Sequence, residues 1–202
     1  MAENYAESCL IVFVKGPVAG KVKTRLAKSI GADHAANVYK ALLAHTYRLV
    51  LPVPFSRCIY YDDHVVAEDL WSAGGFEKYL QTGDTLGNKM ANAFEEQFQR
   101  GYKHVIIIGS DNPELSTADI MDAETRLENH DVVIGPASDG GYYLLGLNKP
   151  IPALLQGMPW SSSRLLAYTI MVLEKESLRY ALLPVRRDID TGDDYRQLKH
   201  LL

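Results

Sequence analysis

Short apolar runs alternate along the chain with segments in which apolar residues recur every three or four positions. Residues 9–14 form the first apolar run, and residues 104–108 carry four branched apolar residues in succession. Runs of this length and composition predict buried strands. By the same pattern we predict further strands at residues 57–61, 78–81, 131–135, 142–147 and 180–185.

The segments between these runs have helical spacing and begin at residues that cap helices. The candidate capping residues are Asp84 or Thr85, Ser116 with Asp119, Ser161, and Thr191 with Asp194. We therefore predict helices over residues 31–50, 65–71, 84–101, 116–129, 161–174, and from 191 toward the C-terminus. Because strands alternate with helices and no linker or repeat interrupts them, we predict an α/β fold with a largely parallel sheet, as a single domain over residues 1–202.

Composition limits the class of protein. Hydrophobic residues make up 47% and charged residues 23% of the 202 positions, which is typical of a soluble globular protein with a sizeable core. The net charge of -4 argues against non-specific nucleic-acid binding, which needs a basic face. No apolar run approaches the roughly 20 residues that cross a bilayer. The acidic, polar residues 1–8 do not resemble a signal peptide, so we expect a cytoplasmic protein.

The two cysteines, Cys9 and Cys58, lie inside apolar runs. This placement predicts buried free thiols rather than a disulfide, and the spacing does not suit metal ligands. The six histidines show no spacing typical of metal ligands, and no Ser-His-Asp or Cys-His set can be argued from spacing.

A basic loop follows the first predicted strand. Its glycines, proline and cations are Lys15, Gly16, Pro17, Gly20, Lys21, Lys23 and Arg25. Glycine lets a backbone approach phosphate closely, and Lys or Arg neutralises its charge. The spacing matches neither the Walker loop nor the Rossmann fingerprint. Two interpretations of this segment are therefore open: a phosphate-binding loop, or a turn followed by an amphipathic basic helix.

Carboxylates follow three of the later strands, and open α/β sheets bind ligands beyond the carboxyl ends of their strands. Asp111 follows residues 104–108, Asp139 follows residues 131–135, and Asp188 and Asp190 follow residues 180–185. Cations for phosphate together with carboxylates for a divalent ion form the set that a nucleotide–Mg²⁺ site needs.

Each carboxylate also has a structural interpretation. Asp111 lies before Pro113 and suits a turn, and Asp139-Gly140 predicts a hairpin. Asp188 and Asp190 precede a helix, where negative charge is favourable.

A further segment, residues 160–164, combines Trp160, three serines and a cation. It suits either the wall of an acceptor pocket or a helix start capped by Ser161.

Taken in order, six segments resemble one known family: FVKGPVAGKVKTRLA, GDTLGNKMANAF, GSDNPEL, GPASDGGYYLLGL, PWSSSR and DIDTGDD. They are similar to the DUF2064 family of small bacterial GT-A-type glycosyltransferase-like proteins, described as nucleotide-diphospho-sugar transferases. The similarity runs from about residue 9 to residue 198. The family is in turn similar to the nucleotidyltransferases of molybdenum-cofactor and F420 biosynthesis. The resemblance implies a Rossmann-like GT-A fold with a mixed, mostly parallel sheet flanked by helices.

The resemblance also implies roles for individual residues. The nucleotide phosphates would be held by Lys15, Gly16, Pro17, Gly20, Lys23 and Arg25. A divalent metal, Mg²⁺ or Mn²⁺, would be held by Asp111 and Asp190. The donor or acceptor would be lined by Asp139, Gly140, Gly141 and Tyr142, with Trp160 and Ser161 as further candidates. In one respect the chain departs from GT-A transferases, because the strand ends in Ser110-Asp111-Asn112 rather than in a DxD pair. That pattern is closer to the nucleotidyltransferases.

Three functions are therefore open. The first is metal-dependent transfer from a nucleotide-diphospho-sugar to a small-molecule acceptor, with Lys23, Arg25 and Asp139 as catalytic residues. The second is nucleotidyl transfer at the same site with release of pyrophosphate. The third is a nucleotide- or sugar-phosphate-binding protein without turnover.

Overall fold

A computed structural model describes residues 5–202 of the protein, so residues 1–4 of the acidic N-terminal segment lie outside the described part. Its seven-stranded sheet has the order β3-β2-β1-β4-β6-β5-β7. The strands are β1 (Ser8–Val14), β2 (Ser56–Tyr61), β3 (Glu77–Leu80), β4 (His104–Ile108), β5 (Val132–Pro136), β6 (Tyr142–Leu147) and β7 (Tyr180–Leu182). Only β6 runs antiparallel to its neighbours, β4 and β5. The expected mixed, mostly parallel α/β sheet is therefore confirmed.

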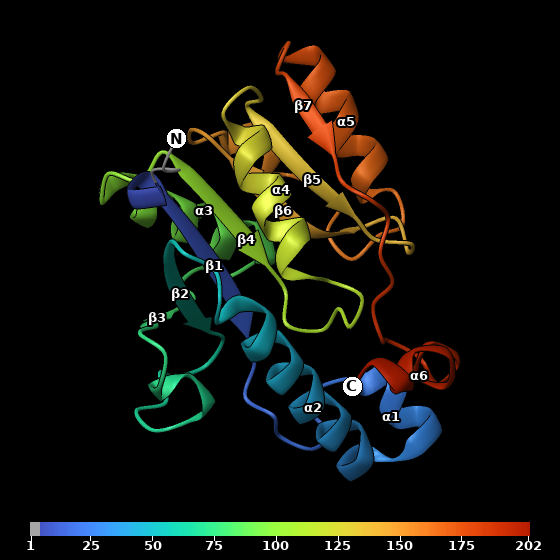
Figure 1. Ribbon diagram of the computed structural model, residues 1–202. Coiled ribbons are helices and arrows are strands. Elements are labelled where there is room, and N and C mark those ends of the chain that lie inside the picture. Colours follow the sequence, from blue (N-terminus) through green and yellow to red (C-terminus); the bar gives the residue numbers. More distant parts are fainter. Residues whose placement is uncertain (1–4) are drawn as a thin grey trace.

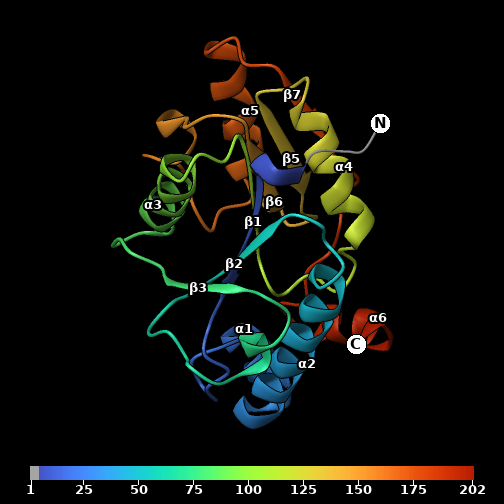
Figure 2. The same ribbon diagram turned by 60° about the vertical axis from the view of Figure 1, so that its left-hand side comes forward.

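Helices cover both faces of the sheet (Figures 1 and 2). They are α1 (Thr24–Ile30), α2 (Ala32–Val50), α3 (Leu86–Gln99), α4 (Thr117–Leu127), α5 (Leu165–Lys175) and α6 (Gly192–Leu198). Figure 2 shows α3 and α4 on opposite sides of the strands. In both views α1, α2 and α6 gather at one end of the molecule, and α5 with β7 lies at the other.

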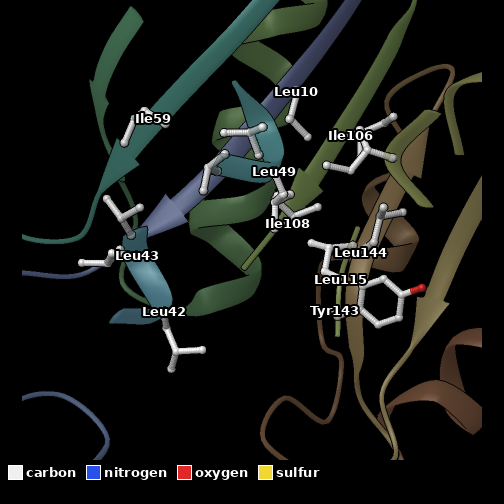
Figure 3. Packing of buried hydrophobic residues seen from close by; sticks show 14 of the residues in the cluster. Leu10, Leu42, Leu43, Leu49, Ile59, Ile106, Ile108, Leu115, Tyr143 and Leu144 are labelled. Atoms are coloured by element: carbon white, nitrogen blue, oxygen red, sulfur yellow. The ribbon is translucent and has the colours of Figure 1, made fainter. Parts of the chain in front are cut away.

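Two apolar clusters hold the layers together because successive strand residues face opposite sides. In β1, Leu10 and Val12 join the cluster under α2 and α4, whereas Cys9 and Ile11 join the cluster under α3. Figure 3 shows the first cluster, where leucines of α2 approach side chains of β1, β4 and β6. The expected buried free thiols are confirmed, since Cys9 and Cys58 are unbridged and fully buried.

The capping predictions at α3, α4 and α6 are confirmed. Thr85 accepts the Asn88 N–H at the start of α3. Ser116 with Asp119 and Thr191 with Asp194 form reciprocal capping boxes.

The helix predicted over residues 65–71 is wrong. Only a single 3-10 turn forms there, at Leu70–Ser72. The Lys78 ammonium explains the difference, because it donates to the carbonyls of Val66 and Ala67 at 2.8 and 2.9 Å. These carbonyls therefore accept hydrogen bonds from a side chain of β3 instead of from the backbone N–H groups of a following helical turn.

Two predicted boundaries also differ. The helix expected from Ser161 begins only at Leu165, with Arg164 at its N-cap position, and Ser161 lies before it with a φ of 58°. The strand expected over residues 180–185 ends at Leu182, close to Pro184, which has no N–H for the ladder. The basic segment after the loop forms a separate short helix, α1, as the second interpretation of that segment predicts, and phosphate binding stays a prediction.

Among residues 5–202, none of the helices is long and apolar enough to cross a membrane.

The centre of the sheet should carry much of the stability. Ile106 of β4 is fully buried and pairs with Leu10 of β1 and Gly146 of β6. We predict that Ile106→Ala lowers the free energy of unfolding by about 2–5 kcal/mol in urea titrations, because it leaves a cavity. Met171→Ala is the matched control, since that side chain is 63% exposed on α5. Equal losses for the two variants would contradict this account of the core.

Candidate functional site

The basic loop, residues 15–23, joins the carboxyl end of β1 to α1 and is held by bonds from two other elements. The Lys15 N–H donates to the Tyr39 hydroxyl of α2 at 2.9 Å, and the Gly16 N–H donates to Asp62 after β2 at 3.2 Å. Gly20 has a φ of 79°, a left-handed conformation that favours glycine. The turn therefore has a fixed shape before any ligand arrives.

Lys23 is the residue at which the loop meets the carboxylates. Its Nζ lies 3.0 Å from Asp111 Oδ2 and 3.2 Å from Asp190 Oδ1, and its side chain is only 5% exposed. The Arg25 guanidinium also pairs with Asp190. Lys23 has a φ of 46°, which is unusual for a residue other than glycine and is typical of functional positions.

Two ion pairs bring the segment after β7 to this site. The Arg187 guanidinium donates to Glu114 Oε1 at 2.7 Å, and the Arg187 backbone N–H donates to Glu114 Oε2 at 2.8 Å. Arg186 pairs with Asp119 of α4 at 2.9 Å. The loop after β4 and the segment after β7 are thereby joined, which places Asp190 beside Asp111.

Lys23, Asp111 and Asp190 form the Lys23 cluster, and its charges shift the pKa values of Lys23 and Asp111. Burial favours neutral Lys23, but Asp111 and Asp190 outweigh it and raise the Lys23 pKa. Burial likewise raises the pKa of Asp111, but the Lys23 and Lys15 cations outweigh it, so the net shift is downward. Both groups are therefore charged at neutral pH.

Asp188 lies next to this cluster, but its pKa shifts in the opposite direction to that of Asp111. Burial, then the charges of Asp111, Asp190 and Asp139, raise its pKa to about 8, although Lys23 opposes them. Its Oδ1 is buried and has no hydrogen-bond partner among the described residues. From the sequence, Asp188 is one of two carboxylates after the last strand, with a position ahead of a helix as the alternative interpretation, and the pattern Asp188-Ile189-Asp190 gives no sign of which carboxylate faces inward.

Two adjoining pockets open at this edge of the sheet. The first, about 400 Å³, is lined by loop residues together with Tyr39, Ser110, Asp111 and Asp190. The second, about 820 Å³, shares Lys15, Arg25, Asp111 and Asp190 with the first and extends toward α3 and β6. Together they could hold a two-part ligand whose phosphates lie at the shared residues.

The second pocket contains most of the residues predicted to bind substrate: Asp139, Gly141, Tyr142, Trp160 and Ser161. Asp139 stands at the expected hairpin between β5 and β6, where it accepts the Gly141 N–H at 2.9 Å. Gly140 lies in the same turn, and its carbonyl accepts the Leu166 N–H. Gly16, Pro17 and Gly20 shape the loop rather than line either pocket.

Two further residues near the predicted set were not found from the sequence. Tyr39 bridges the Lys15 backbone and the Ser110 hydroxyl, each at 2.9 Å, and Asp62 accepts the Gly16 N–H. Asp188 was noted at the end of the last strand but was given no role in the site. Tyr39 lies on the apolar face of a helix, where its spacing matches that of a core residue.

The donor set at Asp111 and Asp190 fits a divalent cation. The two carboxylates already share one positive group, Lys23 Nζ, and carboxylate oxygens suit Mg²⁺ and Mn²⁺. Within residues 5–202, no group of three or more His, Cys, Asp or Glu side chains is arranged to hold a metal ion. A metal at this site would therefore need ligand phosphates or water for its remaining positions.

Comparison with known proteins identifies the family. The model of the family described as "Uncharacterized protein conserved in bacteria (DUF2064)" matches residues 51–162, more than half of the chain. The chain belongs to the DUF2064 family. Among proteins with curated descriptions, none matches it.

Solved structures similar to this DUF2064 protein include one from Desulfovibrio desulfuricans G20, provisionally assigned as a nucleotide-diphospho-sugar transferase. The two are 32% identical with a TM-score of 0.84, over 92% of this chain and 83% of that one. A CMP:2-keto-3-deoxy-manno-octonic acid synthetase complexed with CTP is 10% identical with a TM-score of 0.62, over 97% and 98%. A Mycobacterium tuberculosis H37Rv protein in complex with manganese is 14% identical with a TM-score of 0.54, over 98% and 100%. The last two likenesses show a shared fold.

Removal of the Lys23 charge should destabilise the site. We predict that Lys23→Met lowers the free energy of unfolding by roughly 1–3 kcal/mol, because Asp111 and Asp190 lose their shared partner. The loss should be below that of a fully buried pair, since the Asp111 side chain is 45% exposed. Lys40→Met on the exposed face of α2 is the control in urea titrations. A loss no larger than that of the control would contradict the account of the cluster.

Asp188 should make stability depend on pH. Its folded pKa of about 8 exceeds the ordinary value of 3.8, so the protonated form stabilises the fold at low pH. This contribution is lost as the pH rises from about 4 to about 8. Relative to the natural protein, Asp188→Asn should gain stability over that range, reaching roughly 1–2 kcal/mol or about 2–8 °C in Tm. A Tm difference that does not change between pH 5 and pH 8 would contradict the assignment.

Proposed function

We propose that this protein is a metal-dependent transferase with a nucleotide-activated donor, and that it transfers a glycosyl group from a nucleotide-diphospho-sugar. The observation that carries the proposal is the position of Lys23, which lies between Asp111 and Asp190 beside a preshaped basic loop. This arrangement places cations for phosphate next to carboxylates for a divalent ion. The similarity to a provisionally assigned nucleotide-diphospho-sugar transferase supports it.

In this proposal the loop binds the diphosphate. Lys15, Lys23 and Arg25 neutralise its charge, and Gly16 and Gly20 shape the loop that presents these cations. Mg²⁺ or Mn²⁺, held by Asp111 and Asp190, would supply further neutralisation of the phosphate oxygens when bound. The base and ribose would lie in the first pocket, next to Tyr39 and Gln81.

The reaction forms one bond and breaks one. An acceptor hydroxyl oxygen bonds to the anomeric carbon of the donor, and the bond from that carbon to the phosphate oxygen breaks. The electron pair leaves with the nucleoside diphosphate, where Lys23 and Arg25 stabilise it. Asp139, which lies in the second pocket, takes the hydroxyl proton.

Nucleotidyl transfer is the second candidate. The single carboxylate of Ser110-Asp111-Asn112 and the fold shared with a CTP-bound synthetase favour it. Here an oxygen of the second substrate would bond to the α-phosphorus of a nucleoside triphosphate, and pyrophosphate would leave. The same loop would bind the triphosphate.

A ligand panel separates these candidates. Ligands that bind only the folded state raise the Tm. We predict that a nucleotide-diphospho-sugar with Mg²⁺ or Mn²⁺ raises the Tm more than the metal or the nucleotide alone. A response to a triphosphate but to no sugar nucleotide would favour nucleotidyl transfer. No response to any member of the panel, from a folded sample, would contradict both candidates.

A substitution separates an enzyme from a binding protein. Asp111→Asn should lower metal-dependent turnover on the order of 100-fold, because it weakens charge stabilisation at the phosphates. Lys23→Ala with Arg25→Ala should abolish nucleotide binding measured by calorimetry. Asp33→Asn, exposed at the start of α2 and outside both pockets, is the control. Full activity of Asp111→Asn would contradict the metal assignment, and unchanged affinity of the double variant would contradict the phosphate loop.

A further inference from the structure

The second pocket differs in charge from the phosphate site that it adjoins. Its cations, Lys15 and Arg25, also line the first pocket and belong to the shared boundary. Of the described residues that line only the second pocket, none is Lys, Arg or His, and two are carboxylates, Asp139 and Asp188. An anionic group placed there would face the Asp139 carboxylate without a neutralising partner among the residues that line only this pocket.

From this lining we infer that the second pocket binds an uncharged, polyhydroxylated group and excludes a carboxylated or phosphorylated one. The inference rests on the proposed function, because it takes the shared boundary as the phosphate site. It goes further by naming the chemical class of the group transferred or accepted.

The pocket offers hydrogen-bond acceptors that hydroxyl groups would satisfy. Asp188 Oδ1 is buried without a partner among residues 5–202, and an unpaired buried acceptor is costly. Asp139 is exposed at the pocket, and among the residues that the structure describes only its Oδ1 is engaged, by the Gly141 N–H. The hydroxyls of Ser161 and Ser162 add groups that both donate and accept. A sugar or other polyol carries hydroxyl groups that can donate to these oxygens.

Two aromatic rings form an apolar wall beside those acceptors. Tyr142 and Trp160 pack edge to face, with ring centroids 6.1 Å apart and planes at 77°. Trp160 is partly exposed and lines the pocket. The C–H face of a sugar ring is apolar and suits such a surface, whereas its hydroxyl edge suits the carboxylates.

Two glycines allow the segment that carries Trp160 to pack closely against its neighbours. A Cβ on Gly87 of α3 would lie 2.1 Å from the Leu155 carbonyl oxygen and 2.5 Å from Trp160 Nε1. A Cβ on Gly140, which has a φ of 90°, would lie 2.0 Å from the Ser163 carbonyl oxygen. The lack of side chains at these two positions therefore allows the Trp160 segment to pack closely against both α3 and the Asp139 turn.

The test compares sugar nucleotides that share a base and differ by one carboxylate. The probes are UDP-glucose against UDP-glucuronate and GDP-mannose against GDP-mannuronate, with UDP and GDP alone as references, each titrated calorimetrically with Mg²⁺. We expect the neutral member to bind at least tenfold more tightly than its uronate. Asp139→Asn should reduce that ratio severalfold and leave UDP or GDP affinity unchanged, whereas Asp33→Asn should leave the ratio as it is.

The polyol in the second pocket could be the sugar of the donor or a separate acceptor, and two binding measurements distinguish these cases. Tighter binding of the sugar nucleotide than of its nucleoside diphosphate indicates the donor sugar. Binding of methyl glucoside only in the presence of UDP or GDP indicates a separate acceptor. Either source should shield Trp160 from acrylamide quenching, and Trp71, the other tryptophan, is buried and should not respond.

Equal or tighter binding of the uronates would overturn the inference and leave nucleotide binding intact. Binding of UDP or GDP with no gain from any neutral sugar would also overturn it. If neither nucleotides nor sugar nucleotides bind, the proposed function fails and this inference fails with it. The two failures are thus distinguishable.

Discussion

One ammonium group, that of Lys23, joins the parts of this protein that form its site. Its two partners, Asp111 and Asp190, lie 88 and 167 positions away in the chain. Without this cation, carboxylates from two separate segments would repel one another at the edge of the sheet. The left-handed backbone at Lys23 and its 5% exposure show how strongly the surrounding structure fixes this group.

The sheet makes that arrangement possible. β1 and β4 are parallel neighbours, so the loop after one and Asp111 after the other emerge at the same edge. The antiparallel β6 then adds the Asp139 turn from the adjoining hairpin. Ion pairs of Arg186 and Arg187 add the last segment. Residues from four distant parts of the chain therefore meet at one boundary between two pockets.

Much of the architecture could be predicted from the sequence because its causes are local. Apolar runs identified the strands, and reciprocal Ser-Asp and Thr-Asp spacing located the starts of α4 and α6. The failed helix over residues 65–71 has a tertiary cause, because Lys78 takes two of its carbonyls. No local pattern records that contact.

The site was predictable to a similar extent. Charged residues at strand ends indicated Lys23, Asp111, Asp139 and Asp190, which the structure brings to one edge of the sheet. Their chemical roles stay predictions. Tyr39 was missed, and Asp188 was noted at a strand end without a role, because their importance comes from what faces them in the fold: the Lys15 backbone for Tyr39, and the other carboxylates for Asp188.

The most direct test of the central claim is a crystal structure with Mn²⁺ and a nucleoside diphosphate, with the metal located by its anomalous scattering. The account predicts a manganese peak between Asp111 and Asp190, with the phosphates against residues 15–25. A structure in which Lys23 still bridges the two carboxylates, with the metal and nucleotide bound elsewhere, would contradict it.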